Sequence, residues 1–325
     1  MSGPRAFVRN QFLPLGLVVA AVAGLACPGP GRFMATLPTQ HVAVSVIFLC
    51  SGLLLRTDEI RAALAAWKAT LWGAVAILLI TPFIGAVIAF RLPLAPPYQL
   101  GLALFCCMPT TLSSGIALTG QARGNVALAV LLTALTNLVG IFTVPFLLTV
   151  LMGTLSEVEL SAGELLGQLI LSILVPLAAG KGLRRYVGPW VERRRYRIGL
   201  VSNVALISVP WMKFSQSSEA LARMAVAVLV GIVAAGLLIH GLYLAFNLIT
   251  TRVLGFPPPV RKAVVFLASQ KTLPVALTVL AFLPVPEAVK GLVAIPCVTA
   301  HLSQIFVDAV IATRWGQAGP GPDPA

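Results

Sequence analysis

Ten long apolar segments, separated by short polar breaks, dominate the pattern of the chain. A helix needs about 20 apolar residues to cross the hydrocarbon core of a bilayer, within a range of about 17–25. Such segments run over residues 12–28, 39–55, 67–90, 98–121, 125–152, 162–180, 197–213, 224–251, 260–283 and 287–314. The seventh is short and the ninth is interrupted by KTLP, so the count needs independent support. The pattern predicts an all-α polytopic membrane protein with ten transmembrane helices.

Composition excludes several other classes of protein. Hydrophobic residues make up 58% of the 325 residues and charged residues 10%, against about 45–50% and about 25% in soluble domains. A soluble enzyme, a disordered chain and a coiled coil are therefore excluded. The five cysteines lie in or beside apolar segments without paired spacing, which argues against disulfides or a zinc site. No catalytic motif occurs, so we expect a non-enzyme without a cofactor.

The positive charges test the count of ten. With the N-terminus on the positive side, seventeen of the 23 lysines and arginines fall on that side and five on the other, while Lys271 lies inside a span. This asymmetry is what the positive-inside rule expects, and removing one span would spoil it. The net charge of +13 is thus a topology signal. We expect contact with membrane lipid and none with nucleic acid, and both termini on the cytoplasmic or stromal side.

Ten spans suggest two five-helix repeats of opposite orientation, over about 12–152 and 162–314 of a single transporter unit spanning 1–315. Inverted repeats place broken helices at matching positions in each half. The fourth span, LGLALFCCMPTTLSSGIALT, and the ninth, RKAVVFLASQKTLPVALTVL, are both interrupted by a proline beside polar residues. Such backbone is tolerated at membrane depth only where it lines protein or water. Two ordinary proline kinks are the alternative. Residues 181–197 are predicted to be a basic cytoplasmic loop and 316–325 a flexible tail.

Ionisable residues inside spans are costly and usually face a partner or a cavity. Lys271 lies at the ninth-span break, and Asp308 shares one helix face with His301 and Gln304. This stripe predicts a polar pathway or an ion site, although Asp308 could instead be a hydrated residue near the helix end. Polar stripes elsewhere are more typical of hydrogen bonds between helices; they contain Thr133, Thr136, Asn137, Asn203, His240, Tyr243 and Asn247.

The strings CCMPTTLSSG, GNVALAVLLTALTNLVGIFTVPF, ASQKTLPV and IPCVTAHLSQIFVDAV resemble the bile acid:sodium symporter family (solute carrier family 10). The resemblance covers about residues 10–315 and is strongest to the branch of plastid sodium/metabolite cotransporters and animal member-7 transporters. It implies ten helices in a panel and a core, with broken fourth and ninth helices that cross. It also implies alternating-access transport of organic anions, usually with sodium.

The resemblance also implies sodium ligands, of which some are present and others replaced. Ser114, Thr133 and Gln270 match ligand positions and are the candidate sodium ligands. Gly115 and Ala129 stand where the family has ligands, and Phe266 replaces the glutamate that both ions share. Lys271 stands where an uncharged residue is typical. We hypothesise that the Lys271 ammonium takes the place of a sodium ion. Burial also favours a neutral lysine, which would permit proton coupling.

These observations predict a secondary active transporter of small or amphipathic organic anions, sodium-coupled by resemblance. The candidate substrate- or ion-binding residues are Thr110, Thr111, Ser113, Ser114, Thr133, Asn137, Ser269, Gln270, Lys271, Thr272, His301, Gln304 and Asp308. Two alternatives stay open: a cation/proton antiporter of a related fold, and a membrane regulator of ion homeostasis that transports no solute. A plant or algal chain would belong in the chloroplast envelope, and any other in a plasma membrane.

Overall fold

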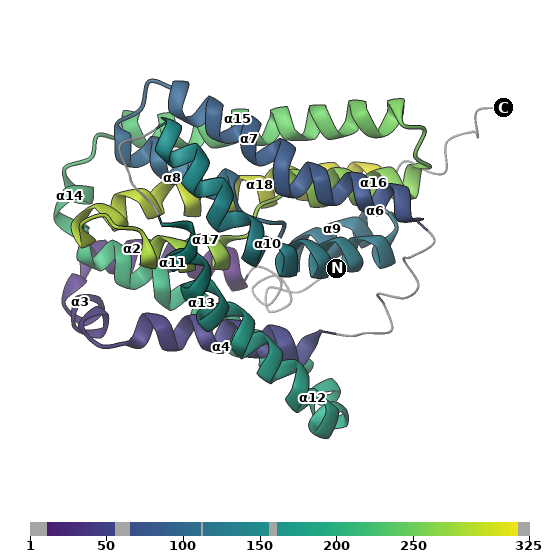
Figure 1. Cartoon of the computed structure of the whole chain (residues 1–325). Helices are drawn as coiled ribbons and strands as arrows, with labels where there is room; N and C mark the ends of the chain where they lie inside the picture. The colour runs from purple at the N-terminus through teal and green to yellow at the C-terminus, as the bar shows by residue number, and fades with distance from the viewer. Residues whose placement is uncertain (1–11, 56–65, 112, 156–160, 318–325) are drawn as a thin grey trace.

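A computed structural model describes residues 12–55, 66–111, 113–155 and 161–317. Every regular element in these ranges is helical (Figure 1). The elements are α2 (Phe12–Ala26), α3 (Pro28–Thr36), α4 (Thr39–Leu54), α6 (Trp67–Val75), η2 (Ala76–Ile80), α7 (Thr81–Arg91), α8 (Pro96–Cys106), α9 (Ser114–Gln121), α10 (Val126–Leu155), α11 (Ala162–Leu169), η3 (Ile170–Leu174), α12 (Val175–Arg193), α13 (Arg195–Gln216), α14 (Ser218–Ala222), α15 (Val226–Val253), α16 (Pro258–Ser269), α17 (Leu273–Phe282) and α18 (Glu287–Gln317). Predictions about residues 1–11, 56–65 and 318–325, including most of the predicted tail, lie outside the described residues.

Seven helices among the described residues are long and apolar enough to cross a membrane. An eighth span results if Leu15–Ala26 and Pro28–Thr36, which meet at an angle of 98°, form one bent span. The predicted second span is the shorter helix Thr39–Leu54, and the predicted fourth is divided into α8 and α9. The helical, many-span character of the chain is therefore confirmed, while the count of ten stays a prediction.

Prolines account for the two predicted breaks. After α8 the described residues 107–111 and 113, which include Pro109, lie outside any helix before α9 begins. After α16 it is extended at Gln270 and Thr272, and α17 begins with Pro274 in its first turn. Proline has no N–H and fixes φ, so it is suited to the first turn of a helix and not to its interior. Both interruptions thus lie where the sequence predicts them.

The helices form two packed groups. In the first, α13 packs against α2, α3 and α4, and α12 packs against α4. In the second, α8 packs against α7 and α18, and α15 packs against α16 and α18. Figure 1 shows the first group in its lower part and α7, α15 and α16 along the upper part. Contacts of α13 with α17 and α18, and of α4 with α17, join the two groups.

Close helix packing in the first group depends on small residues. A Cβ atom at Gly52 of α4 would lie 2.1 Å from the carbonyl oxygen of Leu177, and one at Gly180 of α12 would lie 2.2 Å from that of Leu49. Only glycine allows the two backbones to approach this closely. Small residues at helix interfaces are typical of membrane proteins, where packing rather than hydrophobicity drives association.

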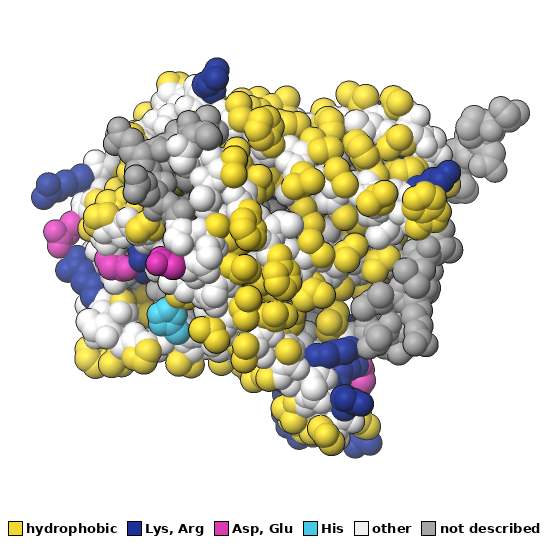
Figure 2. Space-filling model, in the orientation of Figure 1, with side chains coloured by type: hydrophobic (Ala, Val, Ile, Leu, Met, Phe, Trp, Pro, Cys, Tyr) yellow, Lys and Arg dark blue, Asp and Glu magenta, His cyan; other side chains and the backbone are white. Residues whose placement is uncertain are grey.

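The surface has the distribution of side chains that a bilayer requires. Figure 2 shows hydrophobic side chains over the middle of the visible face, with lysine, arginine and acidic residues gathered at its edges and on the projecting end of α12. Large apolar side chains that are more than half exposed occur on many helices, for example Val19, Phe83, Val150 and Leu171. Exposure of this extent is typical of lipid-facing helices.

The basic segment 181–197 differs from its prediction as a loop. Residues up to Arg193 continue α12, and α13 begins at Arg195. Val187 alone has non-helical backbone angles within α12 (φ −113°, ψ 17°), just before the Gly188–Pro189 pair. The segment is helical because each half packs on α4: Val191 and Ile198 form a buried cluster with Cys50 and Leu53. Its basic character suggested a loop, but tertiary contacts determine its conformation.

Candidate functional site

The two breaks lie against each other at the centre of the second helix group. The amide of Thr272 donates a hydrogen bond to the carbonyl oxygen of Pro109 (3.0 Å). The hydroxyl of Thr110 donates to the carbonyl oxygen of Leu267 (2.5 Å). The hydroxyl of Ser114 donates to Oε1 of Gln270 (3.1 Å). Residues far apart in sequence are therefore hydrogen-bonded to one another at the points where the two helices are broken.

Side-chain amides satisfy the backbone that these breaks expose. Nδ2 of Asn137 donates to the carbonyl oxygens of Thr110 (2.9 Å) and Thr133 (2.8 Å). Gln304 pairs with both backbone groups of Lys271: its Oε1 accepts from the Lys271 amide (3.0 Å) and its Nε2 donates to the Lys271 carbonyl (2.7 Å). Unpaired backbone groups are costly at membrane depth. Gln304 therefore replaces the helical hydrogen bonds that Lys271 lacks.

A chain of polar side chains crosses the site beneath the break. Oγ1 of Thr111 and Oγ of Ser114 lie 2.6 Å apart, and Ser114 contacts Gln270. Nε2 of Gln270 donates to Oδ2 of Asp308 (2.6 Å). Asp308 is 0% exposed, which contradicts the alternative that it is a hydrated residue near the helix end. These hydrogen bonds offset the cost of burying the carboxyl group of Asp308.

His240 completes this network. Its Nε2 lies 2.9 Å from Oδ1 of Asp308, and its Nδ1 lies 3.2 Å from the carbonyl oxygen of Ser269. A carbonyl oxygen only accepts, so Nδ1 carries a proton. The sequence predicts hydrogen bonds between helices for His240 and does not place it in the site. The signal that could have placed it there is its helical spacing from Tyr243 and Asn247.

Lys271 is 1% exposed, and its ammonium is held by a distorted turn of a neighbouring helix. Nζ donates to the carbonyl oxygen of Ile77 (2.9 Å) and to Oγ1 of Thr81 (3.0 Å). In this π-helical turn the amide of Thr81 bonds to the carbonyl of Ala76, and Pro82 has no N–H to donate. Ile77 is therefore left without its usual backbone donors, and the ammonium takes their place.

No salt bridge engages Lys271 among the residues that the structure describes. Its ammonium has three N–H groups, two of which are used by Ile77 and Thr81, and it lies 5.8 Å from the centroid of the Tyr243 ring. A buried charge without a counter-charge is costly. A protonated Lys271 would thus supply a positive charge that an anion can stabilise.

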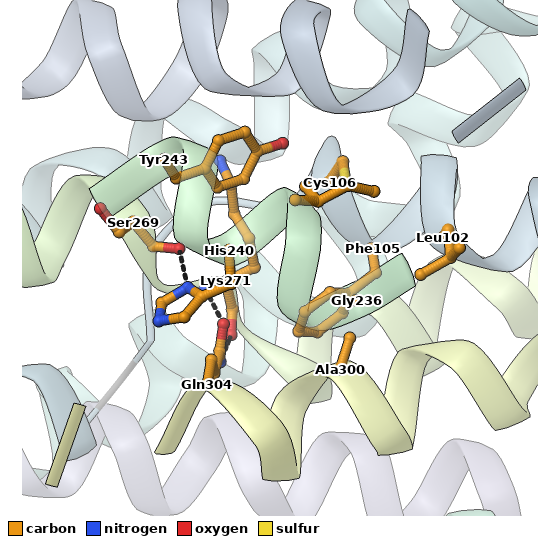
Figure 3. A pocket seen from close by; sticks show the side chains of 11 residues that line it. Leu102, Phe105, Cys106, Gly236, His240, Tyr243, Ser269, Lys271, Ala300 and Gln304 are labelled. Atoms are coloured by element: carbon orange, nitrogen blue, oxygen red, sulfur yellow. Dashed lines mark hydrogen bonds between the residues drawn. The ribbon is translucent and has the colours of Figure 1, made fainter. Parts of the chain in front are cut away.

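Lys271 lines a small, partly open cavity between α8, α15, α18 and the break after α16 (Figure 3). One wall is apolar and includes Leu102, Phe105 and Ile239. The other is polar and includes His240, Tyr243, Ser269, Lys271 and Gln304. Figure 3 shows Phe105, Cys106 and Leu102 on one side, with Lys271 extending toward Tyr243 and Gln304 below it. The cavity therefore offers an apolar surface beside a cation.

The remaining predicted residues occupy different places. Ser269 accepts a hydrogen bond from Nδ2 of Asn247 (3.2 Å) at its hydroxyl. Nδ1 of His301 lies 3.1 Å from Nε2 of Gln304. The hydroxyls of Thr133 and Thr272 are buried without a hydrogen-bond partner in the described part of the chain. Ser113 is exposed, so it stands apart from the buried network.

The candidate sodium ligands are only partly brought together. Ser114 and Gln270 hydrogen-bond to each other, and none of the recorded hydrogen bonds joins Thr133 to either. Phe266, at the position of the family's shared glutamate, is 0% exposed and packs against the Trp315 ring at 5.2 Å. The Lys271 ammonium bonds to η2 and α7 instead of these ligands. These contacts therefore give no support to the hypothesis that the Lys271 ammonium takes the place of a sodium ion.

Comparison with known proteins gives a consistent result. The model of the SBF-like CPA transporter family matches residues 10–317. The probable sodium/metabolite cotransporter BASS4, chloroplastic, of Oryza sativa subsp. indica is 37% identical over 96% of this chain and 77% of its own length. The Arabidopsis thaliana protein of the same name is 37% identical over 96% and 74%. Sodium/bile acid cotransporter 7-B of Xenopus laevis is 28% identical over 94% and 91%.

Proposed function

Because the chain belongs to the SBF-like CPA transporter family, we propose that it is a secondary active transporter that carries small organic anions by alternating access. Membership confirms the family resemblance predicted from the motifs. The chain is thus a multi-pass membrane transporter and not an enzyme.

The buried cation of Lys271 carries the proposal of an anionic substrate. A negative charge about 4 Å from the ammonium would gain about 4 kcal/mol at an effective dielectric constant of 20. The described part of the chain supplies no carboxylate to this lysine. A carboxylate of the substrate would provide the missing counter-charge, and Gln304 and His240 line the same cavity.

The cavity favours a small substrate with an apolar part. The space that a water molecule can occupy in it is about 20 Å³, and about 10–15 Å³ is enough for one water, so this conformation is closed around the site. Leu102, Phe105 and Ile239 would contact the hydrocarbon part of the substrate, and the polar wall would bind its carboxylate. An organic anion, even a small one, would need a wider conformation than this one.

Alternating access requires the two helix groups to separate at one end and close at the other. They are joined where α13 and α14 meet the start of α18. Nζ of Lys213 lies 2.8 Å from Oε2 of Glu287, and the Ser217 hydroxyl donates to the Ala288 carbonyl (2.9 Å). Nζ of Lys290 binds the same carboxylate at 2.7 Å. We assign this contact as a closed gate on the side opposite the positive loops.

The proposed architecture has ten spans in two inverted repeats. It takes α2 with α3 as the first span, α4 as the second, α8 with α9 as the fourth and α16 with α17 as the ninth. One broken helix in each half and the contact between the two breaks support this assignment. The charge asymmetry supports a cytoplasmic or stromal location for both termini. A plastid envelope follows if the chain is of plant or algal origin.

Sodium coupling is the weaker part of the resemblance. The relatives named above are described as sodium cotransporters, but here Gly115 and Phe266 remove two ligands. A sodium ion needs several oxygen ligands, and Ser114 and Gln270 already satisfy each other. We therefore propose that Lys271 supplies the positive charge needed beside the substrate and that sodium does not bind at this site.

A cation/proton antiporter is favoured by one observation. That function needs a carboxylate near the breaks, and the structure places Asp308 against Gln270 there. Its two oxygens are occupied by Gln270 and His240, whereas none of the described carboxylates pairs with Lys271. We therefore rank anion transport first. An antiporter would show proton fluxes driven by a cation gradient in vesicles without any organic anion.

Binding can be tested before the substrate is known. The melting temperature of the purified chain would be measured with choline salts of pyruvate, benzoate, succinate and cholate, because a ligand of the folded state raises it. We expect stabilisation of the wild type by a small monocarboxylate and none of Lys271→Met. Lys68→Met, which removes an exposed lysine, is the matched control. Equal stabilisation of all three proteins would contradict an anion site at Lys271.

A further inference from the structure

The helix that contains α11, η3 and α12 is longer than the hydrocarbon core of a membrane. It runs over Ala162–Arg193 and is kinked at Val187, and the 25 residues before the kink, 162–186, extend about 38 Å at 1.5 Å per residue. The hydrocarbon core is about 30 Å thick and the whole bilayer about 40–45 Å. Its apolar part lies toward its beginning, so a helix of this length brings the residues around and after the kink to the headgroup layer. Figure 1 shows the end of α12 projecting from the body of the protein.

This projecting end is rich in aromatic and basic side chains. Tyr186 is 86% exposed and Trp190 50% exposed. Arg185 and the run Arg193, Arg194 and Arg195 are also exposed, and Figure 2 shows the cluster of basic side chains there. The guanidinium of Arg194 lies 5.4 Å from the centroid of the Trp190 ring. We call the surface formed by Tyr186, Trp190, Arg193, Arg194 and Arg195 the basic tip.

The inner side of this helix is fixed, which determines where the basic tip points. Val191 is fully buried against α4 in the cluster with Cys50 and Leu53. Nζ of Lys181 donates to the Leu55 carbonyl (2.8 Å), and Arg184 donates to the Leu53 carbonyl. These two side chains bind the open carbonyls at the end of α4. The basic tip therefore lies on the opposite, solvent-accessible face.

Within the described part of the chain one carboxylate lies among these arginines, and it does not neutralise them. Glu192 pairs with Arg184 and lies 3.8 Å from Arg195. Arg185, Arg193, Arg194 and Arg197 add further positive charge on the same end of α12 and the start of α13. The surface is thus strongly positive where the chain leaves the hydrocarbon layer.

From these observations we propose that the basic tip binds the headgroups of anionic phospholipids. Guanidinium groups form paired hydrogen bonds with phosphate oxygens. Tyrosine and tryptophan favour the membrane–water interface, and clusters of arginine beside a span are attracted to anionic lipid. The partner is lipid and not a protein, because the length of the helix places the tip at headgroup depth and its aromatic side chains flank the arginines.

The experiment uses the full chain in detergent micelles to which phosphatidylglycerol or phosphatidylcholine is added, with the melting temperature as readout. We expect phosphatidylglycerol to raise the melting temperature more than phosphatidylcholine. The variant Arg193→Gln/Arg194→Gln should lose most of this preference. The control Arg91→Gln/Arg223→Gln, which removes two exposed arginines elsewhere, should keep it, and Arg193→Lys/Arg194→Lys should keep part of it.

Three outcomes would overturn the assignment. The first is an equal effect of both lipids on the wild type. The second is an unchanged preference in Arg193→Gln/Arg194→Gln. The third is stabilisation by polyglutamate, lost in that variant, without any effect of phosphatidylglycerol, which would identify an acidic protein segment as the partner. All variants lie on exposed positions, and their melting temperature without added lipid shows whether they fold as the wild type does.

Discussion

Nζ of Lys271 lies 2.9 Å from the carbonyl oxygen of Ile77, an acceptor that its own helix leaves without a backbone donor. The π turn directs the Thr81 amide to Ala76, and Pro82 has no N–H. The lysine thus compensates for a defect in the α6–η2–α7 helix while keeping its charge beside the cavity. Turns of this kind are often found at functional sites.

We predict that Thr81→Val destabilises the protein, because it removes one of two neutral acceptors from a buried ammonium. The cost of an unsatisfied buried group is about 1–3 kcal/mol. In Lys271→Met the charge is gone, so adding Thr81→Val should cost less than it does in the wild type. Melting temperatures of the two single variants and the double variant measure this coupling.

A control for this pair is Thr278→Val, which removes a buried hydroxyl bonded only to the Pro274 carbonyl (2.8 Å). Its effect should be small and equal in the wild type and in Lys271→Met. Full additivity of Thr81→Val and Lys271→Met would show that Thr81 does not support the ammonium.

Gln304→Leu should destabilise the protein more than the loss of an ordinary side-chain hydrogen bond does. It leaves both the amide and the carbonyl of Lys271 unpaired at membrane depth, at about 1–3 kcal/mol each. We expect a large fall in melting temperature and loss of anion stabilisation. Gln121→Leu, which breaks a single bond to Thr313 at the surface, is the control and should melt near the wild type. Near-normal anion binding in Gln304→Leu would contradict the role of Gln304.

The proposed gate predicts that joining α13 to α18 stops transport. In a Cys27→Ser background, which removes the exposed native cysteine, Ser217→Cys/Ala288→Cys would be linked with a short bifunctional thiol reagent. Because Oγ of Ser217 lies 2.9 Å from the Ala288 carbonyl oxygen, the reagent should hold this end closed. Uptake into vesicles should fall to the level of empty vesicles, and Ser217→Cys alone should be unaffected. Undiminished uptake by the linked protein would refute the gate.

We predict that sodium does not stabilise this chain. The melting temperature should be the same in sodium chloride and choline chloride, since Ser114 and Gln270 bond to each other and Phe266 replaces a ligand. Lys271→Ala should behave likewise, because the ammonium bonds to Ile77 and Thr81. Stabilisation of the wild type by sodium would restore sodium symport. Stabilisation of Lys271→Ala alone would place the ammonium in the position of the ion.

The sequence predicts the breaks because each combines a proline with polar residues inside an apolar segment. It also predicts the stripe of Gln304 and Asp308, since helical spacing is a local property. The sequence does not predict the hydrogen-bond partners of Lys271, because a backbone carbonyl oxygen such as that of Ile77 has no signature in the pattern of side chains. The contact of His240 with Asp308 joins helices distant in sequence. Only tertiary packing distinguishes it from an ordinary bond between helices.

The most direct test of the account is uptake into vesicles of whichever small monocarboxylate stabilises the purified protein most. Wild type, Lys271→Arg, Lys271→Met and Lys68→Met would be compared at equal amounts of reconstituted protein, in sodium and in choline medium. We predict uptake in both media by the wild type and Lys68→Met, partial uptake by Lys271→Arg, and at least tenfold less by Lys271→Met. Uptake by Lys271→Met equal to that of the wild type would contradict the central claim that the buried lysine binds the anion.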